Sequence, residues 1–188
     1  MLLAFYPILF KMIVVFTGNG KGKTTAALGQ ALRAIGDGKR AVMYQFIKGP
    51  WISGEDKVAP AFGEWFKIIK GGKGFVGILG DKLPFEEHQE AAQNTWKGVM
   101  DSARSLRYYL IIADEFNVAL KLGLISKEEV LKDLAEVKEL QKVKKFHLLL
   151  TGRDADPDII ELADLVTEMR EVKHPYQEGK HAEEGLEF

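Results

Sequence analysis

Short apolar segments alternate along the chain with longer amphipathic ones. Residues 13–17 (IVVFT) are β-branched or aromatic, which predicts a buried strand, and the amphipathic segment 24–36 predicts a helix. Further strands are expected over residues 40–46, 65–69, 108–113, 146–150 and 165–169, and further helices over residues 85–106, from Ser126 to about residue 140, and in a short segment near Pro157. This alternation is typical of an α/β fold with a mainly parallel sheet of about six strands and helices on both faces.

Two segments carry no regular pattern. Residues 47–63 contain several glycines and prolines and are expected to form a loop. Residues 70–84 contain five glycines in fifteen positions, together with apolar residues such as Phe75 and Ile78. This composition predicts a mobile or ligand-shaped loop that closes over a bound molecule, and the alternative is a surface excursion whose apolar residues pack on the domain.

The 188 residues predict one domain, with residues 1–11 as an N-terminal arm and residues 170–188 as a polar tail. Met12 is a plausible alternative start. No segment approaches the roughly 20 apolar residues that a membrane-spanning helix requires. We therefore expect a cytoplasmic protein without a membrane partner.

Charge and cysteine content exclude several classes of protein. Lys and Arg total 26 and Asp and Glu total 27, so the formal net charge is −1. This charge argues against a protein whose overall surface binds nucleic acid. There is no cysteine, which excludes disulfides, thiolate catalysis and cysteine-ligated metal sites. The four histidines lack metal-ligand spacing and are interpreted as surface or packing residues. The three tryptophans are interpreted as core and loop packing residues and not as a stacking surface.

The strongest chemical signal is a phosphate-binding loop between the first strand and the first helix. Its residues are Thr17, Gly18, Asn19, Gly20, Lys21, Gly22, Lys23, Thr24 and Thr25. Glycines allow the backbone N–H groups to approach an anion, Lys23 can reach the outer phosphates, and the Thr24 hydroxyl can bind Mg²⁺. Counted from Gly18, the loop is one residue shorter than the usual motif.

Acidic and basic residues follow two other predicted strands. Asp114 and Glu115 end the strand 108–113, where either carboxylate can face a metal ion; the alternative is a pair of acids at a helix start. Arg153 follows the strand 146–150, where it can hold a phosphate or a second substrate, or can be a solvated loop residue. These features predict a magnesium–nucleotide enzyme and leave hydrolysis, phosphoryl transfer and transfer to a second substrate open, beside a nucleotide-binding regulator without catalysis.

Several segments together resemble the P-loop type of ATP:cob(I)alamin (corrinoid) adenosyltransferases. They are GNGKGKTTAA, YQFIKG at 44–49, ADE at 113–115, TGR at 151–153, ADLVTEMREVKHPYQEG at 163–179 and the closing GLEF. The shortened phosphate loop is itself a feature of that family. The resemblance implies a RecA-like fold, usually as a homodimer, in which Co(I) of a reduced corrinoid attacks the 5′-carbon of ATP and tripolyphosphate leaves. A flavoprotein reductant is a candidate partner.

The resemblance also assigns roles to residues. It implies that Lys23, Thr24 with Mg²⁺ and the loop N–H groups bind the triphosphate, that Glu115 with Asp114 beside it binds the metal, and that Arg33 lies near the nucleotide. In the family an aromatic–x–Trp pair packs against the corrinoid, and the nearest match here is Phe75-Val76-Gly77, which keeps the phenylalanine and lacks the tryptophan. The competing interpretation is a P-loop ATPase or kinase that has lost corrinoid activity.

Overall fold

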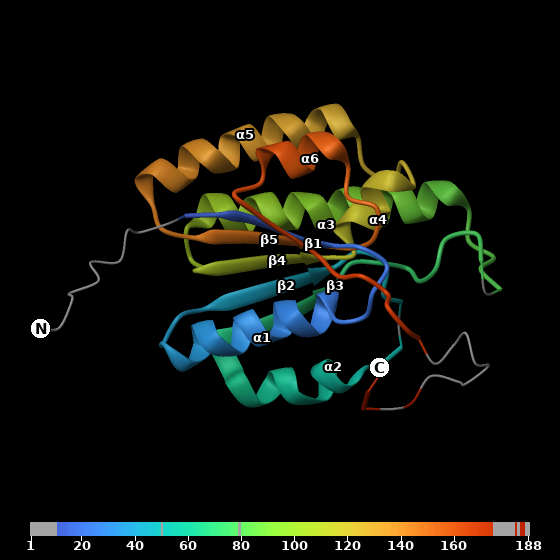
Figure 1. Ribbon diagram of the computed structural model, residues 1–188, viewed down its shortest axis with the longest axis horizontal. Coiled ribbons are helices and arrows are strands. Elements are labelled where there is room, and N and C mark those ends of the chain that lie inside the picture. The colour runs from blue at the N-terminus through green and yellow to red at the C-terminus, as the bar shows by residue number, and fades with distance from the viewer. Residues whose placement is uncertain (1–10, 50, 79, 175–182, 184, 187–188) are drawn as a thin grey trace, which may run out of the picture.

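The computed structural model describes residues 11–49, 51–78, 80–174, 183 and 185–186 (Figure 1). It contains a six-stranded sheet in the order β3-β2-β4-β5-β1-β6, and every neighbouring pair of strands is parallel. The strands are β1 (Ile13–Thr17), β2 (Ala41–Gln45), β3 (Phe66–Lys70), β4 (Leu110–Asp114), β5 (His147–Thr151) and β6 (Leu165–Glu168). The helices are α1 (Lys23–Gly36), α2 (Gly54–Val58), the 3₁₀ helix η1 (Ala59–Trp65), α3 (Phe85–Ser105), α4 (Phe116–Lys121), α5 (Lys127–Val143) and α6 (Pro157–Leu162).

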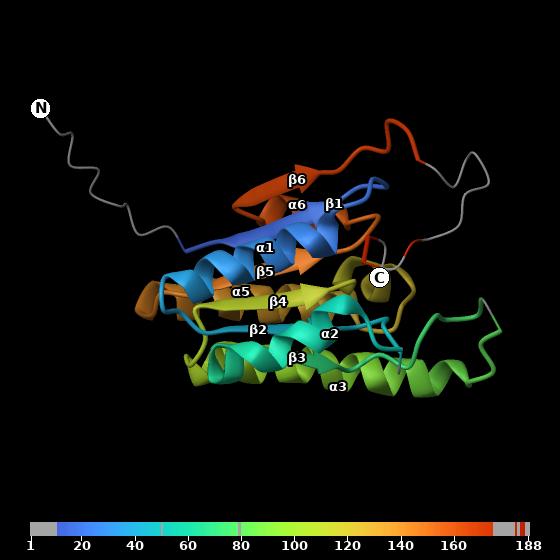
Figure 2. The ribbon, with the colours of Figure 1, turned by 90° about the horizontal axis from the view of Figure 1, so that it is seen from below.

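Helices cover both faces of the sheet. Helices α3 to α6 lie on one face, while α1, α2 and η1 lie on the other (Figures 1 and 2). Alternate residues of each strand supply the two cores: in β1, Ile13 and Val15 pack toward the α3–α6 side, and Val14 and Phe16 pack toward α1. This buried parallel sheet of six strands confirms the predicted α/β class, with β5 lying between the phosphate-loop strand β1 and the acidic strand β4.

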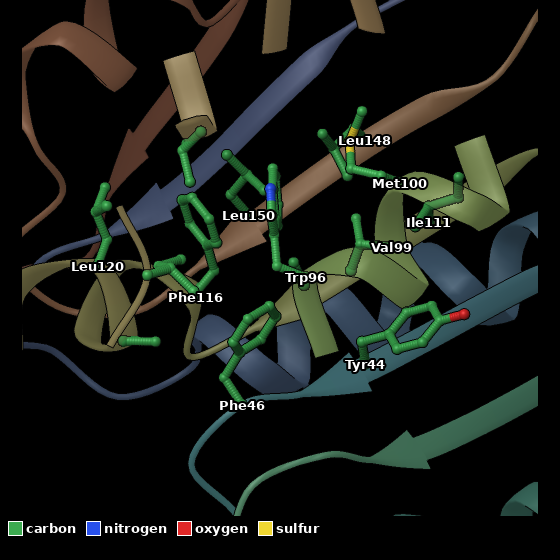
Figure 3. Packing of buried hydrophobic residues seen from close by; sticks show 14 of the residues in the cluster. Tyr44, Phe46, Trp96, Val99, Met100, Ile111, Phe116, Leu120, Leu148 and Leu150 are labelled. Atoms are coloured by element: carbon green, nitrogen blue, oxygen red, sulfur yellow. The ribbon is translucent and has the colours of Figure 1, made fainter. Parts of the chain in front are cut away.

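Aromatic packing fixes the elements that surround the carboxyl end of β4. Trp96 of α3 lies 4.9 Å, centroid to centroid, from Phe116 of α4, and Phe116 meets Phe46 edge-on at 5.9 Å (Figure 3). The Trp96 indole also donates a 2.7 Å hydrogen bond to Asp133 of α5. These contacts join α3, α4, α5 and the end of β2, and they confirm that Trp96 is a packing residue.

Most predicted elements are confirmed, with boundaries displaced by at most three residues. The prediction of a loop over 47–63 is wrong, because this segment contains α2 and most of η1. A capping box begins α2, in which the Ser53 amide donates 2.8 Å to the Asp56 carboxylate. Helix α4 was also missed by the sequence pattern. Both α2 and α4 have six residues or fewer, too few to show helical periodicity.

In the glycine-rich segment after β3, the described residues 71–78 and 80–84 form no helix or strand, as predicted. Within the part of it that the structure describes, Val76 packs against the core on the α3 side of the sheet, whereas Phe75 is exposed. Most of the predicted N-terminal arm, and most of the predicted tail, lie outside the described residues. No helix within the described ranges is long and apolar enough to cross a membrane.

Candidate active site

A cavity of about 670 Å³ lies at the carboxyl edge of the sheet, between the phosphate loop, α1 and the α2–η1 segment. The strand arrowheads in Figure 2 all point toward this edge. Nine residues predicted from the sequence line the cavity: Asn19, Gly20, Lys21, Gly22, Lys23, Thr24, Thr25, Glu115 and Arg153. The fold therefore brings together the phosphate loop, one of the two acidic residues and the predicted arginine.

The phosphate loop is packed against the segment that leaves β6. The Gly20 amide donates a 2.6 Å hydrogen bond to the Met169 carbonyl, so this amide is not free to bind phosphate. A Cβ added to Gly18 would lie 2.4 Å from the Met169 carbonyl oxygen, and one added to Gly20 would lie 2.7 Å from backbone atoms of Arg170. Glycine is required at these two positions mainly because β6 and its exit lie directly against the loop.

Lys23 lies inside the curve of the loop. Its Nζ donates 2.7 Å hydrogen bonds to the carbonyls of Gly18 and Gly20, and the residue is 7% exposed. Burial lowers the pKa of the Lys23 ammonium, partly offset by the nearby Glu115 carboxylate. Because these hydrogen-bond partners are neutral carbonyls, the ammonium charge is available to an anion that enters the loop.

Asp114 connects three elements at the base of the cavity. Its Oδ1 accepts hydrogen bonds of 2.8 Å from both the Thr24 and the Thr151 hydroxyls. The carboxylate is fully buried, which raises its pKa, and its Oδ2 has no hydrogen-bond partner among the described residues. Since the Thr24 hydroxyl donates to Asp114, the lone pairs of its oxygen can face the cavity.

Glu115, unlike Asp114, lines the cavity. It precedes α4 in a left-handed conformation with φ of 60°, and its amide donates 3.0 Å to the Thr151 hydroxyl. Burial, followed by the charge of Asp114, raises the pKa of the Glu115 carboxyl. Sequence reasoning missed Thr151, which contacts both acidic residues. The signal that could have found it is a polar residue at the end of a buried parallel strand, because the carboxyl ends of such strands share one edge of the sheet.

A second pair of charges comes from the opposite wall of the cavity. Lys48, which follows β2, forms an ion pair with Glu55 of α2, and both residues line the cavity. The side-chain amide of the buried Gln45 also donates 3.3 Å from Nε2 to Glu55, while its side-chain oxygen Oε1 lacks a hydrogen-bond partner among the described residues. Burial acts to raise the pKa of Glu55, but the hydrogen bond from Lys48 and other donors outweighs it and lowers the pKa.

Four predicted site residues do not line the cavity: Gly18, which packs against Met169, Asp114, which is fully buried and bonded to Thr24, Arg33 and Phe75. Arg33 is exposed on α1 and does not line it. Phe75 lies in the glycine-rich segment, where its ring is 5.8 Å from that of Trp51, and neither ring lines the cavity. Both rings are exposed, Trp51 to 61% and Phe75 to 44%.

The side chains at the base of the cavity suit a magnesium ion that also binds phosphate oxygens. Among the residues that the structure describes, no group of three or more His, Asp or Glu could hold a metal ion. Mg²⁺ usually takes only one or two protein carboxylates, with substrate phosphates and water completing its shell. The Thr24 hydroxyl, the Glu115 carboxylate and the unpartnered oxygen of Asp114 therefore fit this ion.

Comparison with known proteins gives one consistent result. Residues 10–188 match a protein family described as ATP:corrinoid adenosyltransferase BtuR/CobO/CobP. The chain is 37% identical to the corrinoid adenosyltransferase of Sinorhizobium sp. over 94% of this chain and 80% of that protein. It is 36% identical to the corrinoid adenosyltransferase of Escherichia coli K12 over 94% of this chain and 85% of that protein. Among solved structures, a KaiC-like protein from Pyrococcus horikoshii OT3 aligns with a TM-score of 0.45 and 16% identity, over 83% of this chain and 71% of that one.

Proposed function

This chain belongs to the ATP:corrinoid adenosyltransferase family, and from that membership we propose which of its residues carry the transfer. The enzyme transfers the 5′-deoxyadenosyl group of ATP to the cobalt of a reduced corrinoid. The cobalt electron pair forms the bond to the 5′-carbon, the bond from that carbon to oxygen breaks, and its electrons leave on tripolyphosphate. Co(I) becomes Co(III) in this step.

The reaction places particular demands on the protein. Co(I) is already a strong nucleophile, so no side chain has to remove a proton from it. The enzyme must instead align cobalt, carbon and leaving oxygen, and must stabilise negative charge on the departing triphosphate. We therefore assign the polar residues of the cavity to binding and charge stabilisation, and none of them to general-base catalysis.

The observation that carries the assignment is the convergence of four cationic side chains on one cavity. Lys21 and Lys23 line it from the phosphate loop and the start of α1, and Lys48 and Arg153 line it from the segments that follow β2 and β5. Lys23 lies in the loop before any anion arrives, so little reorganisation is needed when the triphosphate binds. We propose that Lys23 binds the leaving group and that Arg153 and Lys48 surround it. Arg33, exposed on α1, is a weaker candidate for nucleotide contact.

A magnesium ion is proposed to bind between the triphosphate and the base of the cavity. Thr24 and Glu115 would be its protein ligands, and Asp114 would hold the Thr24 hydroxyl in place through their 2.8 Å hydrogen bond. When bound, the ion neutralises part of the charge that develops on the leaving group. Thr151 supports this arrangement, since it donates to Asp114 and accepts the Glu115 amide.

The aromatic pair Trp51 and Phe75 is proposed to contact the corrinoid. Both rings are exposed, although large aromatic side chains are usually well buried. Trp51 follows Lys48 by three residues, so this aromatic surface begins close to the wall of the nucleotide cavity. Apolar cover at this place would exclude water from the reduced cobalt. A homodimer and a flavoprotein electron donor remain proposals, testable by sedimentation and by reduction assays.

A nucleotide analogue distinguishes adenosyl transfer from phosphoryl transfer. In β,γ-methylene-ATP a methylene group replaces the oxygen between the β- and γ-phosphates, so the bond that a kinase or ATPase breaks is no longer cleavable. The bond from the 5′-carbon to oxygen is unchanged. With chemically reduced corrinoid under anaerobic conditions, we expect this analogue to support formation of the cobalt–carbon bond, followed by the optical spectrum of the corrinoid. Release or transfer of the γ-phosphate of ATP, with no cobalt–carbon bond formed from either nucleotide, would favour the ATPase or kinase interpretation.

A further inference from the structure

The carboxylate of Asp81 organises the glycine-rich segment. It accepts hydrogen bonds from the amide of Gly77 at 2.8 Å, from the amide of Leu83 at 3.0 Å, and makes a 2.9 Å contact with Nε2 of His88. The Gly77 and Leu83 amides lower the pKa of Asp81, so the group stays ionised and accepts strong hydrogen bonds. One side chain thus closes the turn and connects it to a helix.

His88 is the fixed end of this connection. It lies in the first turn of α3, and the residue is only 3% exposed. The same helix buries Ala91, Ala92 and Trp96 in the core, so its position is set independently of the glycine-rich segment. A histidine with these surroundings can hold a loop in place without touching a substrate.

The connection reaches the chain at Gly77, two residues after Phe75. Val76 packs into the core while its neighbour Phe75 is exposed, and the Gly77 amide that binds Asp81 comes directly after them. Gly77 and Gly80 have φ of 69° and 82° and no atom within 4 Å of an added Cβ, so neither makes a close packing contact that could hold the turn. Without the contact between Asp81 and His88, this turn would lose its hydrogen-bonded link to α3.

We infer that His88 is a positioning residue for the corrinoid half of the reaction: through Asp81 it holds the segment that presents Phe75 beside Trp51. This inference rests on the proposed function, because it takes the Trp51–Phe75 pair as the corrinoid-contacting surface. His88 contacts neither the cavity residues nor the proposed metal ligands in any described interaction. Its loss should therefore affect the corrinoid and leave ATP binding unchanged.

The test compares His88→Leu with His88→Gln. Leucine fills the site but cannot hydrogen-bond, whereas glutamine carries an amide nitrogen that can reach Asp81. The control is His147→Leu, since His147 is half-buried at the opposite, amino-terminal end of β5. We expect His88→Leu to raise the KM for reduced corrinoid about tenfold, because removing a hydrogen bond to a charged group typically weakens an interaction by about that factor. The KM for ATP should not change. His88→Gln should bring the KM for corrinoid most of the way back to the wild-type value, and the control should change neither KM.

Amide exchange tests the same inference without catalysis. The amides of Gly77 and Leu83 should exchange faster in His88→Leu than in the wild type, while the exchange rates of the α1 amides should not change. If His88→Leu does not fold, Asp81→Ala provides the same measurement. Unchanged exchange, or equal changes in both KM values that glutamine does not restore, would overturn the inference. If the wild type adenosylates no corrinoid, the proposed function fails instead, and the exchange data still decide whether His88 holds the segment.

Discussion

The Thr24 hydroxyl donates a 2.8 Å hydrogen bond to Oδ1 of Asp114, joining the first turn of α1 to the last residue of β4. These residues are 90 positions apart in the sequence. The bond fixes the hydroxyl that would bind magnesium relative to the acidic end of the sheet. Thr151 donates to the same oxygen, so Asp114 holds two hydroxyls and keeps its second oxygen unpartnered.

Asp114 should make the stability of the ligand-free protein depend on pH. Burial raises its pKa in the folded state, so between the ordinary carboxyl pKa and this raised value the folded protein binds more protons than the unfolded chain. The free energy of unfolding should therefore fall as pH rises through this window. We expect Asp114→Asn to flatten that fall, measured by urea unfolding from about pH 4 upward without Mg²⁺ or nucleotide. An unchanged slope would mean that Asp114 is not the group responsible. The pKa of the Glu115 carboxyl is also raised, so Glu115→Gln is the variant for comparison.

Replacing Lys23 should remove most of the activity without unfolding the protein. Its ammonium lies in the loop as a preorganised donor, and loss of one such donor typically lowers the rate about 100- to 1,000-fold. We expect Lys23→Ala to show this loss in kcat at saturating ATP, with an unfolding midpoint close to that of the wild type. Near-normal turnover would mean that this loop does not bind the leaving triphosphate.

Glu115→Gln should raise the Mg²⁺ concentration needed for half-maximal rate. The amide keeps the shape of the carboxylate but removes the charge that a hard cation prefers. The KM for corrinoid should change less than the Mg²⁺ requirement, because Glu115 lines the nucleotide cavity and the Trp51–Phe75 pair does not. Superimposable magnesium titrations for variant and wild type would exclude Glu115 as a ligand and leave Asp114 as the candidate.

A methyl group at Gly20 should separate the phosphate loop from the segment after β6. The added Cβ would lie 2.7 Å from backbone atoms of Arg170, so one of the two chains must move. We expect Gly20→Ala to lower the free energy of unfolding by about 1–3 kcal/mol, as overpacking does elsewhere. Gly29→Ala on α1 is the matched control, since nothing lies within 4 Å of its Cβ, and it should stabilise the protein by about 0.5–1 kcal/mol. Equal effects of the two substitutions in urea unfolding would contradict this account of the loop.

The sequence predicted the parts of the site that depend on local pattern and on parallel strand ends. An apolar run, a glycine turn and an amphipathic segment identified the loop that carries Lys23, and the ends of parallel strands share one edge, so Asp114 was expected near it. Glu55 was missed because α2 has only five residues and no periodicity. Arg33 shows a second limit of sequence-based prediction, which is the direction in which a helical residue points. Because an α-helix turns about 100° per residue, Leu32 lines the cavity while its neighbour Arg33 does not.

The chemical form of the phosphate released tests the central claim most directly. The protein would be mixed with ATP, Mg²⁺ and chemically reduced corrinoid without oxygen, and ³¹P NMR would be recorded alongside the optical spectrum of the corrinoid. A second sample without corrinoid would be followed by ³¹P NMR alone. Our account predicts one intact tripolyphosphate for each cobalt–carbon bond formed, and no phosphate release when corrinoid is omitted. Orthophosphate and ADP appearing at the same rate with and without corrinoid would contradict it.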